Sequence, residues 1–272
     1  GYYRLDLEAP AGTVVDLFGV EYINAEGAVQ HTGPYRNGMR YICKEGRNEL
    51  LAFRRRSQRH LFVTLRNMTG PVRIRHLELI ESTYPTDFAE GFSCSDEALT
   101  AIWQISARTL KLCMEDTYTD CPLYEQTLWV GDARNEGLYG LECLGAYDIT
   151  ERCVRLAAES LEEYPIVLCQ VPSTWETLLP NWSFLWVISV HDYYLWTGKR
   201  ELVEKTWPAI MENMRGAAGY VAERDLFSAP FWNMFDWSGI DDNHRIVLHN
   251  SMFLCGAAKH ARELAELLGK AE

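Results

Sequence analysis

Residues 95–110, with the sequence SDEALTAIWQISARTL, mark a change from strands to helices along the chain. Ser95 is a residue type that caps helix N-termini, and the acidic Asp96 and Glu97 suit a first helical turn. An apolar stripe then follows at the spacing of one helix face: Leu99, Ile102, Trp103, Ile105 and Leu110. The stretch therefore predicts a helix that begins at a Ser95 cap and buries this stripe.

The residues before this helix alternate apolar and polar side chains with a period of two. Leu61–Leu65 and Val72–Leu77 show the alternation most clearly, and residues 68–71 (MTGP) form one of several turn clusters between such runs. Short strands separated by Gly- and Pro-containing turns are typical of a β-sandwich. Because the runs are few, we expect residues 1–88 to form a partial β-sandwich.

The residues after this helix predict a helical domain over residues 89–272. Five further segments have helical periodicity, and Gly269 would end the last of them: Asp132–Leu144, Asp148–Glu163, Ser183–Trp196, Arg200–Arg224 and Asn250–Leu268. No strong strand pattern lies between them, so the helices are expected to form hairpins laid side by side. The fold class is therefore multidomain, with β structure followed by α structure.

Charge and composition exclude several classes of partner. The net charge is -12, and the acidic excess lies after residue 88, which argues against nucleic acid as a partner. No apolar run is long enough to span a membrane, and no signal peptide is visible. The eight cysteines show no zinc-ligand spacing, and we expect buried free thiols, which mildly favours a reducing, cytoplasmic compartment.

Residues 120–132, with the sequence DCPLYEQTLWVGD, hold the densest group of reactive side chains. Pro122 holds the residue before it in extended geometry, so the segment is predicted to be a loop. Asp120, Glu125 and Asp132 could supply the carboxyl groups of a catalytic site. They could equally be an Asx-turn residue, a solvated loop acid and a helix cap, and the residues alone leave both interpretations open.

All nine tryptophans follow residue 100, and five of them fall in predicted loops or at helix ends: Trp129, Trp175, Trp182, Trp232 and Trp237. The flat apolar face of an indole can stack on the C–H face of a sugar ring. A sugar-binding platform and ordinary core packing are both open for this group.

The 120–132 loop resembles the signature of the bacterial α-L-rhamnosidases, glycoside hydrolase family 78. Six residues stand at matching positions: Asp120, Pro122, Glu125, Trp129, Gly131 and Asp132. Asn181-Trp182 before the helix that ends in Trp196-Thr197-Gly198, and the motif Phe235-Asp236-Trp237, are similar to the family as well. The resemblance implies a β-sandwich that leads into an (α/α)6 barrel, which this chain would contain only incompletely.

The resemblance also implies a reaction, the inverting hydrolysis of a terminal α-L-rhamnoside in a rhamnose-containing oligosaccharide or glycoside. Glu125 matches the general acid, and its proton would be retained by neighbouring carboxylates such as Asp120 and Asp132. Substrate binding is implied for six residues: Asp120, Trp129, Asp132, Trp182, Asp236 and Trp237. No cofactor and no metal are implied.

Two departures from the family pattern qualify this expectation. The arginine of the family signature is absent, and Leu123-Tyr124 occupies that stretch. The general base of the family lies far downstream and no residue here matches it, since spacing nominates neither Glu176 nor Asp241. We therefore expect a fragment that lacks the base and whose uncovered apolar helix faces favour association into a homo-oligomer.

Three other interpretations remain open. The chain could be a non-catalytic carbohydrate-binding relic, or another (α/α)6 carbohydrate-active enzyme such as a different glycosidase or a lyase. It could also be a helical scaffold whose loop acids only cap helices.

The histidines show no paired metal-ligand spacing. His260 and Glu263 are three residues apart on a predicted helix, where a solvated side-chain pair is expected. His191 lies in an apolar helix and is expected to be a core histidine.

Overall fold

The computed structural model describes the chain apart from residues 30–36, 87–90, 236, 238–246 and 271–272. It divides into two compact units. One comprises Gly1–Thr83 with Cys121–Gln126, and the other comprises Tyr84–Asp120 with Thr127–Glu272. The boundary expected between residues 88 and 89 lies outside the described residues.

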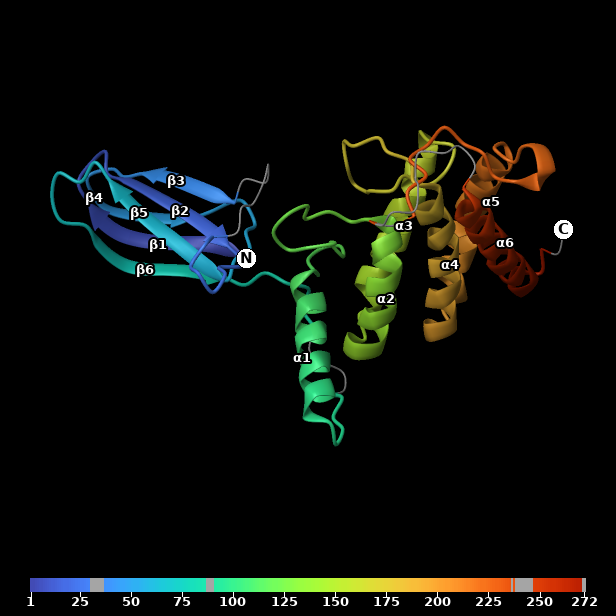
Figure 1. Ribbon diagram of the computed structural model, residues 1–272, viewed down its shortest axis with the longest axis horizontal. Helices are drawn as coiled ribbons and strands as arrows, with labels where there is room; N and C mark the ends of the chain where they lie inside the picture. Colours follow the sequence, from blue (N-terminus) through green and yellow to red (C-terminus); the bar gives the residue numbers. More distant parts are fainter. Residues whose placement is uncertain (30–36, 87–90, 236, 238–246, 271–272) are drawn as a thin grey trace. The chain divides into compact units, whose positions relative to one another are not determined.

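The first unit contains two antiparallel sheets of three strands each (Figure 1). One has the order β4-β1-β6 and the other β3-β2-β5. The strands are β1 (Tyr2–Ala9), β2 (Val14–Val20), β3 (Gly38–Ile42), β4 (Gly46–Leu51), β5 (His60–Arg66) and β6 (Arg73–Ile80).

The two sheets share one hydrophobic core. Leu5 and Leu7 of β1 and Val15 and Leu17 of β2 are buried in it, and the residue between each pair points to the other face of its sheet. This period of two explains why the alternating sequence forms strands, and the expectation of β structure before α structure is confirmed.

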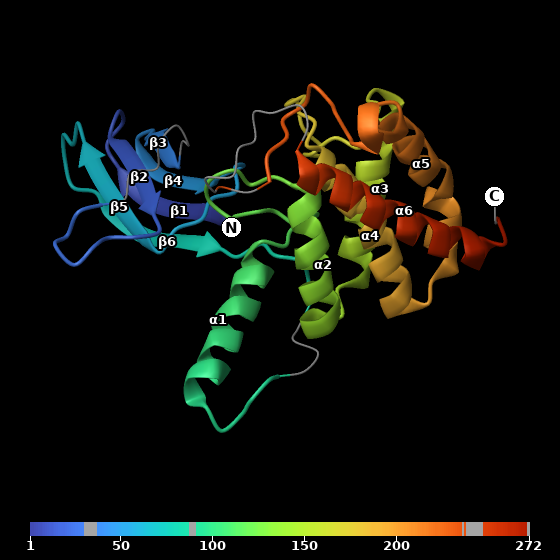
Figure 2. The ribbon, with the colours of Figure 1, turned by 45° about the vertical axis from the view of Figure 1, so that its right-hand side comes forward.

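The second unit is helical. Its α-helices are α1 (Glu97–Leu112), α2 (Val130–Leu144), α3 (Tyr147–Glu159), α4 (Pro180–Thr197), α5 (Arg200–Ala218) and α6 (Leu248–Leu268), with short 3-10 turns at Ser160–Glu162 and Glu223–Asp225. Helix α4 packs between α2 and α6, while α3 and α5 pack against α4 from a second layer (Figure 2). Within the described chain, no helix is long and apolar enough to cross a membrane.

The core of this unit is centred on α4. Phe184, Trp186, Val187, Val190 and Tyr193 are all buried, which covers most of the circumference of this helix. A helix that is apolar all round requires neighbours on every side. This explains the central position of α4 and the burial of these five side chains.

Several predicted helix ends differ from the structure. The cap of α1 is Asp96 rather than Ser95, because Asp96 Oδ1 accepts the amide of Ala98 at 2.9 Å. Helix α2 begins at Val130, two residues before its predicted start, so Asp132 lies in the first turn. Helix α5 ends at Ala218, whereas the prediction continued to Arg224, whose positive φ of 65° does not fit a helix.

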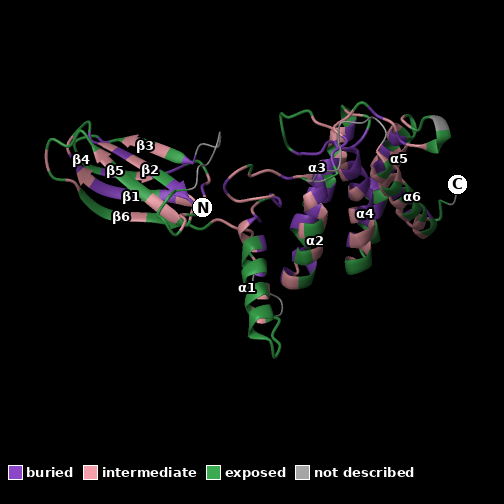
Figure 3. Ribbon diagram, viewed as in Figure 1, coloured by how far each residue is buried: buried purple, intermediate pink, exposed green. Residues whose placement is uncertain are grey.

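The apolar stripe of α1 is mostly exposed, contrary to the expectation that it is buried. Leu99, Ile102 and Ile105 are 51%, 58% and 67% exposed, while Ala107 and Leu110 are buried. Figure 3 shows the exposed surface along most of α1, in contrast to the buried faces of α2 and α4. The stripe has the pattern of a packed face, but no described residue covers most of it.

All eight cysteines are free, as expected from their spacing. Four are buried: Cys43, Cys113, Cys153 and Cys169. Cys255 was expected to be buried as well, but its side of α6 is exposed.

Candidate active site

The segment with the catalytic signature is a loop whose flanking residues are hydrogen-bonded to each other. The Asp120 amide donates to the Thr127 carbonyl at 3.1 Å, and the Thr127 amide donates to Asp120 Oδ1 at 3.3 Å. One carboxylate oxygen of Asp120 thus accepts a backbone amide across the loop, seven residues along the chain and not two as in the Asx turn that the sequence left open. These two bonds fix where the loop leaves and rejoins the helical unit.

Glu125 lies on the six-residue loop Cys121–Gln126, where its side chain is exposed. Its amide donates to Cys121 Sγ at 3.2 Å, and the Gln126 side chain donates to the Pro122 carbonyl at 2.7 Å. Gln126 has a positive φ of 53°, a conformation that most side chains disfavour. The backbone on both sides of Glu125 is therefore held by local contacts.

Asp132 lies in the first turn of α2, where a carboxylate is stabilised by the positive end of the helix dipole. It is not the helix cap, because Trp129 holds that position in extended geometry. Gly131, directly before Asp132, packs on Trp182 so closely that an added Cβ would lie 2.4 Å from the indole ring. Glycine is therefore required here for the approach of α4 to α2.

The structure adds a carboxyl group that the sequence analysis missed. Glu136 lies one helical turn after Asp132, and its Oε2 is buried with no hydrogen-bond partner among the described residues. Burial, and to a smaller extent the charges of Asp132 and Asp120, raise the pKa of Glu136 to about 8. Near neutral pH this side chain therefore holds its proton.

Glu136 thus occupies the electrostatic position that the sequence analysis expected for Glu125. The signal in the sequence was its spacing of four residues from Asp132, which places both on one face of α2. Without the structure, nothing showed that this face is buried.

The loop before α2 is fixed by a short antiparallel pairing with residues 169–171. The Val130 amide donates to the Cys169 carbonyl at 2.8 Å, and the Val171 amide donates to the Leu128 carbonyl at 3.2 Å. The Trp232 amide in turn donates to the Leu178 carbonyl at 3.2 Å. Three loops that are distant in the sequence are thereby connected by backbone hydrogen bonds.

These loops carry a row of four tryptophans. Trp129 and Trp175 have ring centroids 5.6 Å apart, Trp175 and Trp232 are 6.2 Å apart, and Trp232 and Trp237 are also 6.2 Å apart. Trp175 and Trp237 are 50% and 85% exposed, so the row presents indole surface to solvent. We refer to these four residues as the tryptophan row.

Of the three tryptophans predicted to bind substrate, Trp182 lies outside the tryptophan row. It packs against Cys169, Leu179 and Met234, and its Nε1 is buried without a hydrogen-bond partner in the described part of the chain. Asp236 lies outside the described residues. Trp175 and Trp232 were noted only as loop tryptophans, and the structure places them between Trp129 and Trp237.

Comparison with known proteins defines the class of this chain. Residues 87–272 match a family model of a six-hairpin glycosidase domain, described in full as the bacterial alpha-L-rhamnosidase 6 hairpin glycosidase domain. The match includes every helix of the second unit. The chain belongs to the bacterial α-L-rhamnosidase family.

Solved structures agree with this assignment. The GH78 family rhamnosidase of Bacillus sp. GL1 is 42% identical in sequence to this chain and has a TM-score of 0.96. The match covers 100% of this chain and 28% of the Bacillus chain. The rhamnosidase from Klebsiella oxytoca with rhamnose bound is 19% identical, with a TM-score of 0.82, over 98% of this chain and 55% of its own.

The Streptomyces avermitilis α-L-rhamnosidase complexed with L-rhamnose shares the fold at 17% identity, with a TM-score of 0.76, over 99% of this chain and 26% of its own. The chain thus spans between about a quarter and about half of the length of these three rhamnosidases. Comparison with curated proteins finds no match.

Proposed function

We propose that this chain contributes the acid-bearing part of an inverting α-L-rhamnosidase site. The family relation supports a glycoside hydrolase function. The observation that carries the finer proposal is the 42% identity to a GH78 rhamnosidase over the whole chain, including the 120–132 loop.

Glu125 is proposed as the general acid. An inverting glycosidase needs one carboxylic acid to protonate the leaving oxygen and a second carboxylate to activate water on the other face of the sugar. Glu125 matches the position of the family acid, and exposure on a loop with a fixed backbone suits a group that must reach a substrate.

Asp120 and Asp132 are proposed to hold sugar hydroxyls. Ionised carboxylates accept hydrogen bonds from hydroxyl groups, and both side chains are only partly buried. Glu136 is proposed to support them as a neutral carboxylic acid, since a third negative charge beside these two is disfavoured. The role of Glu136 is positioning, through the charge balance around Asp120 and Asp132.

The tryptophan row is proposed as the apolar wall of the sugar site. Rhamnose is a 6-deoxy sugar, so it presents a methyl group and C–H faces that pack well on indole rings. Rhamnose is present in the Klebsiella and Streptomyces structures that share this fold. Trp129 and Trp237 keep their predicted role, and we extend it to Trp175 and Trp232.

The general base is proposed to lie in sequence outside these 272 residues. The chain corresponds to 28% of the Bacillus rhamnosidase, so most of such an enzyme has no counterpart here. We also propose that α1–α6 form part of an (α/α)6 barrel that further hairpins complete.

Calorimetry with L-rhamnose and a matched release assay test this proposal. The chain is expected to bind L-rhamnose in preference to D-glucose, and Asp132→Asn is expected to weaken that binding at least tenfold. Release of rhamnose is expected only from the enzyme of full length. Failure of the chain and of the full enzyme to bind rhamnose would contradict the proposal.

The same assay separates the alternatives. Binding by the full-length enzyme without turnover would identify a carbohydrate-binding relic, whereas an unsaturated sugar product would identify a lyase.

A further inference from the structure

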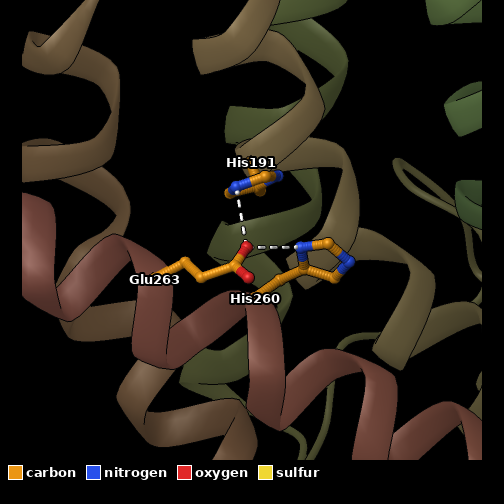
Figure 4. A group of neighbouring side chains, drawn as sticks. All are labelled: His191, His260 and Glu263. Atoms are coloured by element: carbon orange, nitrogen blue, oxygen red, sulfur yellow. Dashed lines mark hydrogen bonds and ion pairs between the residues drawn. The ribbon is translucent and has the colours of Figure 1, made fainter.

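Two histidines and a glutamate meet between α4 and α6, away from the residues discussed above. Glu263 Oε2 lies 3.1 Å from His191 Nε2 and 3.2 Å from His260 Nδ1 (Figure 4). The two imidazole rings have centroids 4.5 Å apart. His191, expected from the sequence to be a core histidine, thus also contacts Glu263. The His260–Glu263 pair therefore has a third member, which comes from another helix.

One of the two ring nitrogens of His191 makes no hydrogen bond to the described residues. Its Nδ1 is buried and has no hydrogen-bond partner among the residues that the structure describes. A metal ion binds an imidazole through a ring nitrogen that carries no proton, and each ring has one such nitrogen in its neutral form.

The distances in the cluster fit a small divalent ion. One donor atom from each residue can be chosen so that all three lie within 4.8 Å of one another. Ligand atoms about 2.0–2.1 Å from a tetrahedral Zn²⁺ are separated by roughly 3.4 Å. The separations of 3.1 and 3.2 Å between Glu263 Oε2 and the two ring nitrogens need to widen by only a few tenths of an ångström. The two ring nitrogens lie within 4.8 Å of each other and would adjust toward the same value on binding.

The donor set indicates the kind of metal. Two imidazoles and one carboxylate suit Zn²⁺ and similar transition ions, whereas Mg²⁺ and Ca²⁺ prefer oxygen ligands alone. The side chains of His191, His260 and Glu263 are 12%, 25% and 32% exposed, so solvent can reach the group and water can complete the coordination.

We propose that His191, His260 and Glu263 form a Zn²⁺ site that joins α4 to α6. Binding would replace the contacts of Glu263 Oε2 with the two imidazoles by metal–ligand bonds. In each neutral imidazole the proton would then lie on the ring nitrogen that does not bind the metal, Nδ1 of His191 and Nε2 of His260. The site does not depend on the rhamnosidase proposal, because it shares no residue with the carboxylates or the tryptophan row.

Titration of the metal-depleted chain with ZnCl₂ in competition with a chromophoric chelator tests this proposal. One Zn²⁺ per chain is expected to bind, and His260→Gln and Glu263→Gln are each expected to weaken binding at least about tenfold. The melting temperature is expected to rise with added Zn²⁺ in the unmodified chain and not in these variants. Both substitutions are at partly exposed positions, so the test does not depend on replacing the more buried His191.

His76→Gln is the matched control, since His76 is exposed on β6. It is expected to leave the affinity unchanged. The free cysteines can also bind Zn²⁺, and Co²⁺ distinguishes the two cases because thiolate ligands add a charge-transfer absorption that imidazole and carboxylate lack. Absence of saturable binding, a thiolate spectrum, or binding that survives both substitutions would overturn the proposal.

Discussion

Glu136 is a carboxyl group whose charge state is set by burial and by its neighbours. Glu136 lies one turn after Asp132 on α2, and its Oε2 is buried without a hydrogen-bond partner among the described residues. Its pKa is raised from 4.5 to about 8. Near neutral pH Glu136 therefore holds its proton, because a further negative charge beside Asp132 and Asp120 is disfavoured.

The raised pKa of Glu136 predicts a pH-dependent loss of stability. In the unfolded chain Glu136 ionises near its ordinary value, whereas the folded chain retains the proton up to about pH 8. Its contribution to stability is therefore complete below about pH 4.5, falls as the pH rises, and is lost above about pH 8. Denaturant unfolding at a series of pH values measures this.

Glu136→Gln is expected to gain stability relative to the unmodified chain across that pH range, because the amide does not ionise. The difference between the two proteins isolates Glu136 from every other titrating group. A difference that is independent of pH, or that has the opposite sign, would contradict the raised pKa.

Gly131→Ala is expected to destabilise the chain by about 1–3 kcal/mol, because the added methyl group overlaps the Trp182 ring. The free energy of unfolding and the tryptophan fluorescence measure the effect. Gly256→Ala on α6 is the control. There the nearest neighbouring atom outside the helix is 3.8 Å from the added Cβ, and a gain of up to about 1 kcal/mol is expected. Equal effects of the two substitutions would contradict the close approach of α4 to α2.

At the scale of the elements, the sequence pattern predicted which segments are helical better than it predicted their ends. Each of the six α-helices overlaps a segment that the sequence pattern predicted to be helical. The ends depend on single caps, and Ser95 and Asp96 are both suitable residue types, so the pattern could not separate them.

The site was predictable to a lesser degree, for a related reason. Asp120, Glu125 and Asp132 lie close together in the sequence and could be noticed as a group. The tryptophan row and the pKa of Glu136 depend on contacts between loops and helices, which single-sequence periodicity does not contain.

Exposure along α1 predicts unequal effects of truncating its apolar residues. Leu110→Ala is expected to cost about 2–5 kcal/mol, because Leu110 is buried in the helical core. Ile105→Ser is expected to change stability by no more than about 0.5 kcal/mol, since Ile105 is 67% exposed. Thermal or denaturant unfolding of this chain compares them. A cost at Ile105 equal to that at Leu110 would show that the stripe is covered in solution.

At the scale of the whole molecule, two units with separate cores occur in a chain that corresponds to a fraction of its structural relatives. The acidic balance after residue 88 belongs to the helical unit that also carries Asp120, Asp132 and Glu136. A neutral sugar is compatible with this charge, whereas a polyanion is not.

The distribution of thiols predicts how the native chain reacts with a disulfide reagent. Cys94 and Cys255 are exposed and are expected to react quickly, and the partly buried Cys121 and Cys143 more slowly. Burial raises the pKa of Cys153 and of Cys169 to about 12, so these two are expected to react only after unfolding. Titration with Ellman's reagent, with and without denaturant, counts the thiols. Reaction of more than four thiols in the native chain would contradict the burial.

Turnover by the Glu125→Gln variant tests whether Glu125 is the general acid. In the full-length enzyme, the variant is expected to lose about 10²–10⁴-fold in kcat on α-L-rhamnosides with poor leaving groups, because these need a proton in the transition state. The loss is expected to be far smaller on an aryl rhamnoside with an activated leaving group, and Glu142→Gln at an exposed position of α2 is expected to be neutral on both. Near-normal turnover of the poor leaving group by Glu125→Gln would contradict the assignment of Glu125 as the acid.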